Sequence, residues 1–190
     1  MSGTPHAGAA SAEASESALI ILIPEADALV DKHRAHLDLA ASWGVMAHVT
    51  VLYPFAPPDE LTDDALDRLD AVLAPFSAFD CRFERTGWFG ESVLWLAPEP
   101  AEPFRALTDA VWRAFPAYPP YRGVHGSHTP HLTVAGPLEN QLRAMRRVED
   151  EVRPGLPITA KVTTVSLLVG YPRPDSWGLV RQFELDSARV

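Results

Sequence analysis

Residues 48–51 read His-Val-Thr-Val, and residues 131–134 repeat the pattern as His-Leu-Thr-Val. Successive side chains of an extended strand point to opposite faces, so His48 and Thr50 share one face, as do His131 and Thr133. The apolar partners on the other face can pack against a core. Two such strands on either side of a cleft would present two imidazoles and two hydroxyls to one space, which is a suitable arrangement for a phosphate group.

The segments around the two copies follow the same order of elements. Hydrophobic periodicity and turn residues predict helices over 25–41, 62–76, 101–115 and 138–153. They predict strands over 18–23, 78–86, 92–96, 158–169 and 177–185, in addition to the two His-x-Thr strands. Each half therefore runs strand, helix, loop, His-x-Thr strand, helix, strand. This order predicts an α+β fold of two pseudo-symmetric lobes, each a small, mainly antiparallel sheet packed by helices, with a central cleft that carries both His-x-Thr strands.

The bulk properties favour a soluble globular protein. The chain has 190 residues and is 47% hydrophobic, and no apolar run approaches the length that crosses a bilayer. Residues 1–17 are rich in Ala, Ser and Gly and predict a disordered N-terminal tail, which leaves 18–190 as one bilobal domain. Cys81 is the only cysteine, so we expect a structural thiol and a reducing, cytoplasmic setting.

Net charge limits the class of partner. The formal charge of −9 argues against a groove for long nucleic acid, which needs many Lys and Arg contacts to phosphate. A small nucleotide or a single RNA terminus remains compatible with this charge, and we expect no membrane partner. The sequence gives no basis for an oligomeric state.

The two tetrapeptides and their flanks resemble the 2H phosphoesterase superfamily, which includes the bacterial 2′-5′ RNA ligases, also called RNA 2′,3′-cyclic phosphodiesterases. The resemblance rests on residues 48–55, which continue as Leu-Tyr-Pro-Phe, and on 130–135, and it extends over about 18–186. It implies a bilobal fold and catalytic roles for His48, Thr50, His131 and Thr133. It also implies opening of a 2′,3′-cyclic phosphate on a nucleotide or RNA end to a 2′-phosphate, with 2′-5′ RNA ligation as the reverse-type activity.

The chemistry of the four residues agrees with this implication. Displacement at a phosphodiester needs a base for the attacking oxygen and an acid for the leaving oxygen, and two imidazoles can fill both roles near neutral pH. The Thr50 and Thr133 hydroxyls would hold the non-bridging oxygens. The scheme requires no metal or other cofactor. The sequence does not decide which histidine is the base.

Two other classes of function remain open. A non-catalytic nucleotide-binding module would keep the cleft without turnover. A metallohydrolase could use His125, His128 and His131, although the spacing matches no standard zinc signature and few carboxylates lie nearby. Within the same loop, Arg122 and His125 are candidates for substrate binding.

Two aromatic residues after the first His-x-Thr strand are weaker candidates for stacking on a ligand. By strict alternation Tyr53 falls on the packing side of its strand. Phe55 lies beyond Pro54, where the strand has ended. We therefore give a stacking role for Tyr53 little weight and leave Phe55 unassigned.

Overall fold

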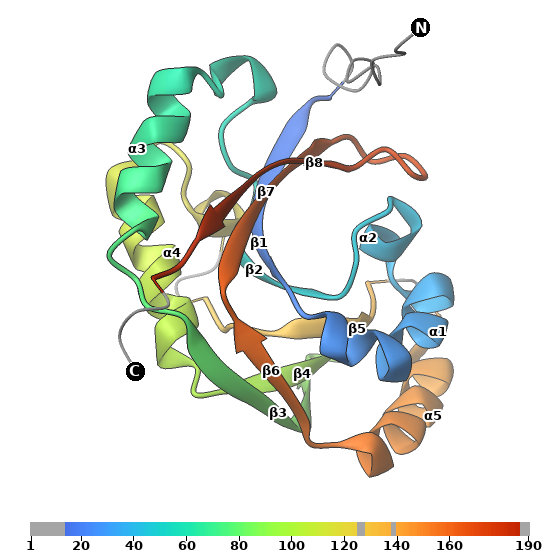
Figure 1. The fold of residues 1–190 in the computed structure, drawn as a ribbon. Coiled ribbons are helices and arrows are strands. Elements are labelled where there is room, and N and C mark those ends of the chain that lie inside the picture. Colours follow the sequence, from blue (N-terminus) through green and yellow to red (C-terminus); the bar gives the residue numbers. More distant parts are fainter. Residues whose placement is uncertain (1–13, 125–127, 138–139, 187–190) are drawn as a thin grey trace, which may run out of the picture.

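The computed structural model describes residues 14–124, 128–137 and 140–186 (Figure 1). The strands are β1 (Glu16–Leu22), β2 (His48–Leu52), β3 (Phe79–Phe89), β4 (Val93–Glu99), β5 (Leu132–Ala135), β6 (Ile158–Val162), β7 (Thr164–Gly170) and β8 (Gly178–Glu184). The α-helices are α1 (Asp27–Leu37), α2 (Leu39–Ser42), α3 (Asp63–Leu73), α4 (Glu102–Ala114) and α5 (Leu142–Val152). Short 3₁₀ helices include η1 (Pro24–Ala26) and η3 (Pro120–Gly123).

The eight strands form a single sheet in the order β6-β3-β4-β5-β2-β1-β7-β8, and all neighbouring strands are antiparallel. The sheet curls strongly, as Figure 1 shows. The predicted α+β class is confirmed, and both halves of the chain contribute to one sheet instead of a small sheet each. The His-x-Thr strands β2 and β5 are neighbours at its centre, as the duplicated order of elements predicts.

The third strand of each half pairs with the other half. β3 follows the first His-x-Thr strand in the chain but pairs with β4, and β7 follows the second but pairs with β1. The central four strands are therefore flanked symmetrically, by β3 on one side and β7 on the other. Residues 158–170 contribute to both ends of the curled sheet. β6 is the edge strand beside β3, whereas β7 lies between β1 and β8 near the opposite edge. The predicted strand over 158–169 therefore divides at Thr163.

Alternation along β2 and β5 separates the core from the cleft. Val49, Val51, Leu132 and Val134 are buried and join one hydrophobic cluster with side chains of α1, α3, α4 and α5. The helices thus cover the outer face of the sheet. Cys81 lies in the same cluster, where burial raises the pKa of its thiol to about 12 and supports the predicted structural role.

Local side-chain chemistry sets several boundaries. Thr62 caps α3 by accepting a hydrogen bond from the Ala65 amide, as the sequence predicts. The predicted helix over 25–41 is broken at Asp38, which has extended backbone angles and caps α2 through the Ala40 amide. The first strand begins at Glu16, two residues earlier than expected, and α5 begins only at Leu142. No helix in the described ranges has the length and apolar character needed to cross a bilayer.

Candidate active site

The register of the two central strands brings the His-x-Thr pairs together. Val49 is the partner of Leu132 in the antiparallel β2–β5 pair. Continuing this register by one residue places His48 opposite Thr133 and Thr50 opposite His131. In regular antiparallel pairing, directly opposite Cβ atoms lie about 5 Å apart and diagonal ones about 7–8 Å. The two histidines therefore occupy one diagonal of a four-residue array and the two threonines the other.

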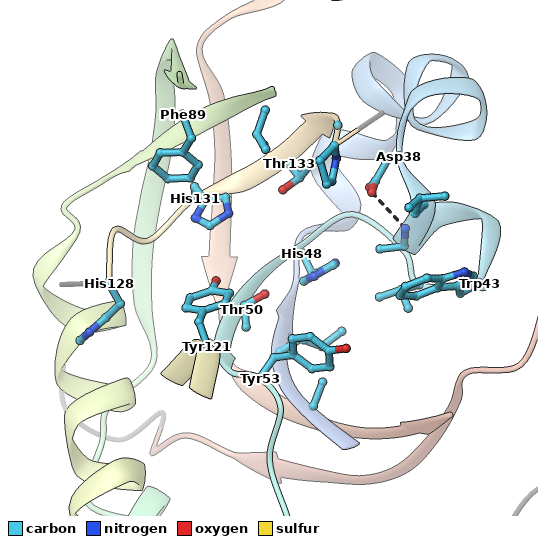
Figure 2. A pocket seen from close by; sticks show the side chains of 18 of the residues that line it. Asp38, Trp43, His48, Thr50, Tyr53, Phe89, Tyr121, His128, His131 and Thr133 are labelled. Atoms are coloured by element: carbon cyan, nitrogen blue, oxygen red, sulfur yellow. Dashed lines mark hydrogen bonds between the residues drawn. The ribbon is translucent and has the colours of Figure 1, made fainter. Parts of the chain in front are cut away.

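The array opens into a cleft of about 830 Å³ that is lined by all four side chains. Figure 2 shows the two imidazoles and two hydroxyls at the centre of this cleft. Each of the four residues is half-buried, whereas the alternating apolar residues are fully buried. The predicted division into a chemical face and a packing face is confirmed at both strands.

The two imidazole rings are held in the same way. Nδ1 of His48 lies 2.8 Å from the Met46 carbonyl oxygen, and Nδ1 of His131 lies 2.7 Å from the Thr129 carbonyl oxygen. A carbonyl oxygen only accepts, so each Nδ1 carries a hydrogen and donates it. This fixes the tautomer and leaves Nε2 as the ring atom that exchanges a proton with a ligand.

Both rings favour the neutral form in the ligand-free protein, and the groups that shift their pKa values differ. Burial lowers the pKa of His48 to about 4, and the hydrogen bond to the Met46 carbonyl opposes this shift, while the positive charge of Arg34 and the charge of His131 add to it. Burial also lowers the pKa of His131, opposed by its hydrogen bond to the Thr129 carbonyl. The contribution of Arg34 to the lowered pKa is specific to His48, since the shift of the His131 pKa arises from burial and the Thr129 carbonyl. The two sides of the array are thus electrostatically distinct.

A buried ion pair lies behind the His48 side. Arg34 donates to Asp38 Oδ2 from Nε at 3.0 Å and from Nη2 at 2.9 Å, and it also donates to the Val45 carbonyl. Both side chains are almost fully buried. Asp38 borders the cleft and caps α2 (Figure 2), so the pair fixes the helix that forms this part of the wall.

Tyr121 is a site residue that the sequence interpretation missed. Its hydroxyl shares a hydrogen bond with the Thr50 side chain, and burial raises its pKa against the opposing effect of that bond. Tyr121 and Arg122 have positive φ angles of 50° and 56°, and the Tyr121 amide donates to the Tyr53 carbonyl at 2.7 Å. Left-handed conformations in non-glycine residues persist only where the surroundings fix them. The usable signal was an aromatic residue between Pro120 and Gly123, in a tight turn close before the second motif.

Tyr53 also lines the cleft, which corrects the prediction from strict alternation. Leu19 pairs with Leu52, but the next residue, Ile20, pairs with Thr50, so Val51 is an extra residue on β2. Such a bulge reverses the phase of the residues that follow. Tyr53 consequently faces the cleft and meets Trp177 edge to face. Phe55 is buried against Phe115 and Tyr118 and has no place in the cleft.

The two substrate-binding candidates in the 116–130 loop have different positions. Arg122 is exposed and pairs with Glu16 at 3.3 Å, and it is not among the cleft-lining residues. Glu16 also accepts a 2.6 Å hydrogen bond from the Tyr53 hydroxyl. Glu16 therefore links Arg122 to Tyr53 in the cleft wall. His125 lies outside the described residues.

The metal alternative gains no support from the described part of the loop. His128 Nε2 lies 3.8 Å from Asp109 on α4, and its ring points away from His131 in Figure 2. Nδ1 of His131 is already engaged by Thr129. Within residues 14–124, 128–137 and 140–186, no three His, Cys, Asp or Glu side chains gather closely enough to hold a metal ion.

Comparison with known proteins gives a consistent picture. The sequence model of the 2′-5′ RNA ligase superfamily matches residues 23–171. The Thermus thermophilus protein TT0787 has a similar fold, with a TM-score of 0.63 and 18% identity over 92% of this chain and 100% of that one. Escherichia coli LigT in complex with 3′-AMP is also similar, with a TM-score of 0.58 and 14% identity over 91% of this chain and 99% of that one. A search of curated proteins returned no match.

The structural likenesses, at these identities, establish the fold. The family match covers most of the chain and includes both His-x-Thr strands. The chain belongs to the 2′-5′ RNA ligase superfamily, whose members are 2H phosphoesterases.

Proposed function

We propose that this chain is a metal-independent phosphodiesterase that opens 2′,3′-cyclic phosphates on a nucleotide or an RNA end. The observation that carries the proposal is the matched pair of imidazoles in one cleft, each with Nδ1 donating to a backbone carbonyl. This pairing leaves two Nε2 atoms for proton transfer on either side of a phosphate. E. coli LigT, a protein of similar fold, has been solved with 3′-AMP and with phosphate, which supports a nucleotide phosphate as the ligand.

The arrangement of the four side chains suits in-line displacement. With phosphorus at the centre of the array, the histidines lie on opposite sides, along the line of attack and departure. The Thr50 and Thr133 hydroxyls then donate to the non-bridging oxygens, where negative charge builds up in the transition state. Tyr121 holds the Thr50 hydroxyl in place through their shared hydrogen bond.

The positive charge of Arg34, which acts on His48, supports one assignment of the two proton-transfer roles. Arg34 disfavours a protonated His48, so we assign His48 as the base that takes a proton from the attacking water. A bound phosphate anion raises the pKa of both rings, and we assign His131 as the acid that takes up the proton. Water attacks phosphorus, the P–O3′ bond breaks, and His131 protonates O3′. The products are a 2′-phosphate and a free 3′ hydroxyl.

The test is turnover of the four nucleoside 2′,3′-cyclic phosphates and a cyclic-phosphate-ended oligonucleotide in the presence of EDTA. Phosphorus NMR distinguishes the 2′-phosphate product from the 3′ isomer. We expect turnover in EDTA and the 2′-phosphate only. Loss of activity on chelation would support the metallohydrolase alternative. Binding without turnover would support the nucleotide-binding module.

A 2′-5′ ligase activity would be the same displacement with a 5′ hydroxyl in place of water. The 5′ hydroxyl would attack phosphorus, the P–O3′ bond would break, and a 2′-5′ phosphodiester and a free 3′ hydroxyl would result. The two histidines would keep their roles, with His48 taking the proton of the 5′ hydroxyl and His131 protonating O3′. Incubation of an RNA 2′,3′-cyclic phosphate with an excess of a 5′-hydroxyl oligonucleotide, followed by mapping of the linkage, tests this activity.

A further inference from the structure

The walls of the cleft are apolar on both sides of the four polar side chains. Beyond His131 lies Phe89, whose ring centroid is 4.9 Å from that of His131. Beyond His48 lie Trp43 and Tyr53, as Figure 2 shows, and Trp177 meets Tyr53 on this side. A ligand whose phosphate sits in the array therefore meets aromatic rings in either direction.

Part of this apolar lining remains open to solvent. Leu39, Phe89 and Val124 line the cleft and are 41%, 37% and 74% exposed. Trp95 supports the Phe89 ring from behind, with 5.0 Å between the centroids. A planar or apolar group that enters the cleft would remove this surface from water.

The cleft also lacks basic side chains. No lysine or arginine is among its described lining residues, and Asp38, its one acidic residue, is neutralised by Arg34. Arg122 is paired with Glu16. Among the described lining residues, the side chains that can carry a positive charge are the histidines.

From these observations we infer that the site selects a substrate with a single negative charge, a cyclic phosphodiester joined to an uncharged planar or apolar group. A nucleoside 2′,3′-cyclic phosphate with a free 5′ hydroxyl has this character. A 5′-phosphorylated nucleotide or an oligonucleotide adds phosphates that would lie against apolar walls in a chain of net charge −9. Proteins that hold several phosphates normally do so with basic side chains. This inference rests on the proposed function and narrows it to mononucleotide-sized substrates.

The volume of the cleft is in keeping with such a ligand. Pockets of about 300–1,000 Å³ bury most of the surface of a small organic molecule. The cleft, at about 830 Å³, falls within this range. A longer RNA would need to extend beyond it, along a chain whose formal net charge is −9.

The experiment compares kcat/KM for three matched substrates. They are adenosine 2′,3′-cyclic phosphate, the same compound with a 5′-phosphate, and a trinucleotide that ends in a cyclic phosphate. We expect each added phosphate group to lower kcat/KM by roughly tenfold or more, because it adds uncompensated charge close to a poorly solvated wall. We also expect the rate on the first substrate to change little with salt concentration. Equal or faster turnover of the 5′-phosphorylated compound or the trinucleotide would overturn the inference.

A pair of variants at the mouth separates charge from size. Val124→Arg adds a cation to the lining, and Val124→Gln adds a polar side chain without charge at the same exposed position. On the 5′-phosphorylated substrate we expect kcat/KM of the arginine variant to be about threefold or more above that of the glutamine variant. On the substrate with a free 5′ hydroxyl, the two variants should have equal kcat/KM. Equal rates of the two variants on the 5′-phosphorylated substrate would contradict a charge-based selection.

Calorimetric binding of the same compounds keeps this inference distinct from the proposed function. A preference for the singly charged compound, in the absence of any turnover, would contradict the proposed phosphodiesterase and support the inference on ligand class. Turnover with equal affinity and equal rate for all three compounds would support the proposed phosphodiesterase and contradict the inference on ligand class.

Discussion

Val49 lies opposite Leu132 across the central β2–β5 pair, and this pairing places each histidine of the array across from the threonine of the other motif. A shift of one residue in either strand would turn one motif toward the helices and break the array. Because Val49 and Leu132 are both fully buried, the hydrophobic core itself holds the register. The packing face of the strands thus determines the geometry of the chemical face.

Removal of either threonine hydroxyl should slow the chemical step. Thr50→Val and Thr133→Val keep the side-chain shape but cannot donate to a non-bridging oxygen, so we expect kcat to fall about 100- to 1,000-fold. Thr50→Ser and Thr133→Ser retain the donor and should lie within about tenfold of the unchanged protein. Steady-state kinetics on a 2′,3′-cyclic nucleotide measures both. Valine variants as active as the serine variants would contradict the assigned roles.

Tyr121 should act through Thr50 as a positioning residue. Tyr121→Phe removes one hydrogen bond, and we expect kcat to fall about fivefold, in line with a net contribution of about 1 kcal/mol. When Thr50→Val is already present, the same change should have little further effect. A double-mutant cycle measures this coupling. Additive losses would show that Tyr121 acts independently of Thr50.

The neutral state of His48 should make the fold sensitive to acid. Its pKa is lowered in the folded protein to about 4 from an ordinary value of 6.5. Between these values the unfolded chain binds a proton that the folded chain does not, so stability falls as pH decreases through this window and is unaffected above it. The loss is at most about 3 kcal/mol, because each pKa unit corresponds to about 1.4 kcal/mol. His131 contributes in the same direction.

Urea denaturation between pH 7 and pH 4 tests the acid sensitivity. His48→Gln should lose less stability over this window than the unchanged protein. His36→Gln, at an exposed histidine of α1, serves as the matched control and should keep the full pH dependence. Identical pH profiles for the His48→Gln variant and the unchanged protein would contradict the lowered pKa.

The Arg34–Asp38 pair should be essential to the wall of the cleft. Arg34→Met leaves a buried carboxylate without its partner, and we expect a loss of about 3–5 kcal/mol in the free energy of unfolding. The matched control is the exposed Arg82–Glu84 pair, where Glu84→Gln should cost less than about 1 kcal/mol. Thermal or urea denaturation measures both. If Arg34→Met lowered the free energy of unfolding no more than Glu84→Gln does, burial of the Arg34–Asp38 pair would be unimportant for stability.

The His-x-Thr motifs could be predicted because their information is local. Alternation within four residues assigns His48 and Thr50 to one face, and repetition of the motif identifies both strands. The pairing of β3 with β4 and of β7 with β1 could not be predicted, since hydrophobic periodicity contains no information about distant partners. The two halves were therefore expected to form separate small sheets.

The errors at Tyr53 and Tyr121 have physical causes of the same kind. The extra residue Val51 reverses the phase of β2, and only the pairing with β1 reveals it. Tyr121 reaches Thr50 from a loop whose left-handed backbone is fixed by a hydrogen bond to Tyr53. The influence of Arg34 on His48 likewise depends on burial that the sequence of α1 does not disclose.

The most direct test of the account is the turnover number of His48→Ala and His131→Ala on a nucleoside 2′,3′-cyclic phosphate, measured in EDTA. Each variant should lose about 100- to 10,000-fold in kcat, and the double variant should lose little more, because the two residues act as one unit. His36→Ala controls for a histidine outside the cleft and should be fully active. If either single cleft variant retains the turnover of the unchanged protein, the two-histidine mechanism is wrong.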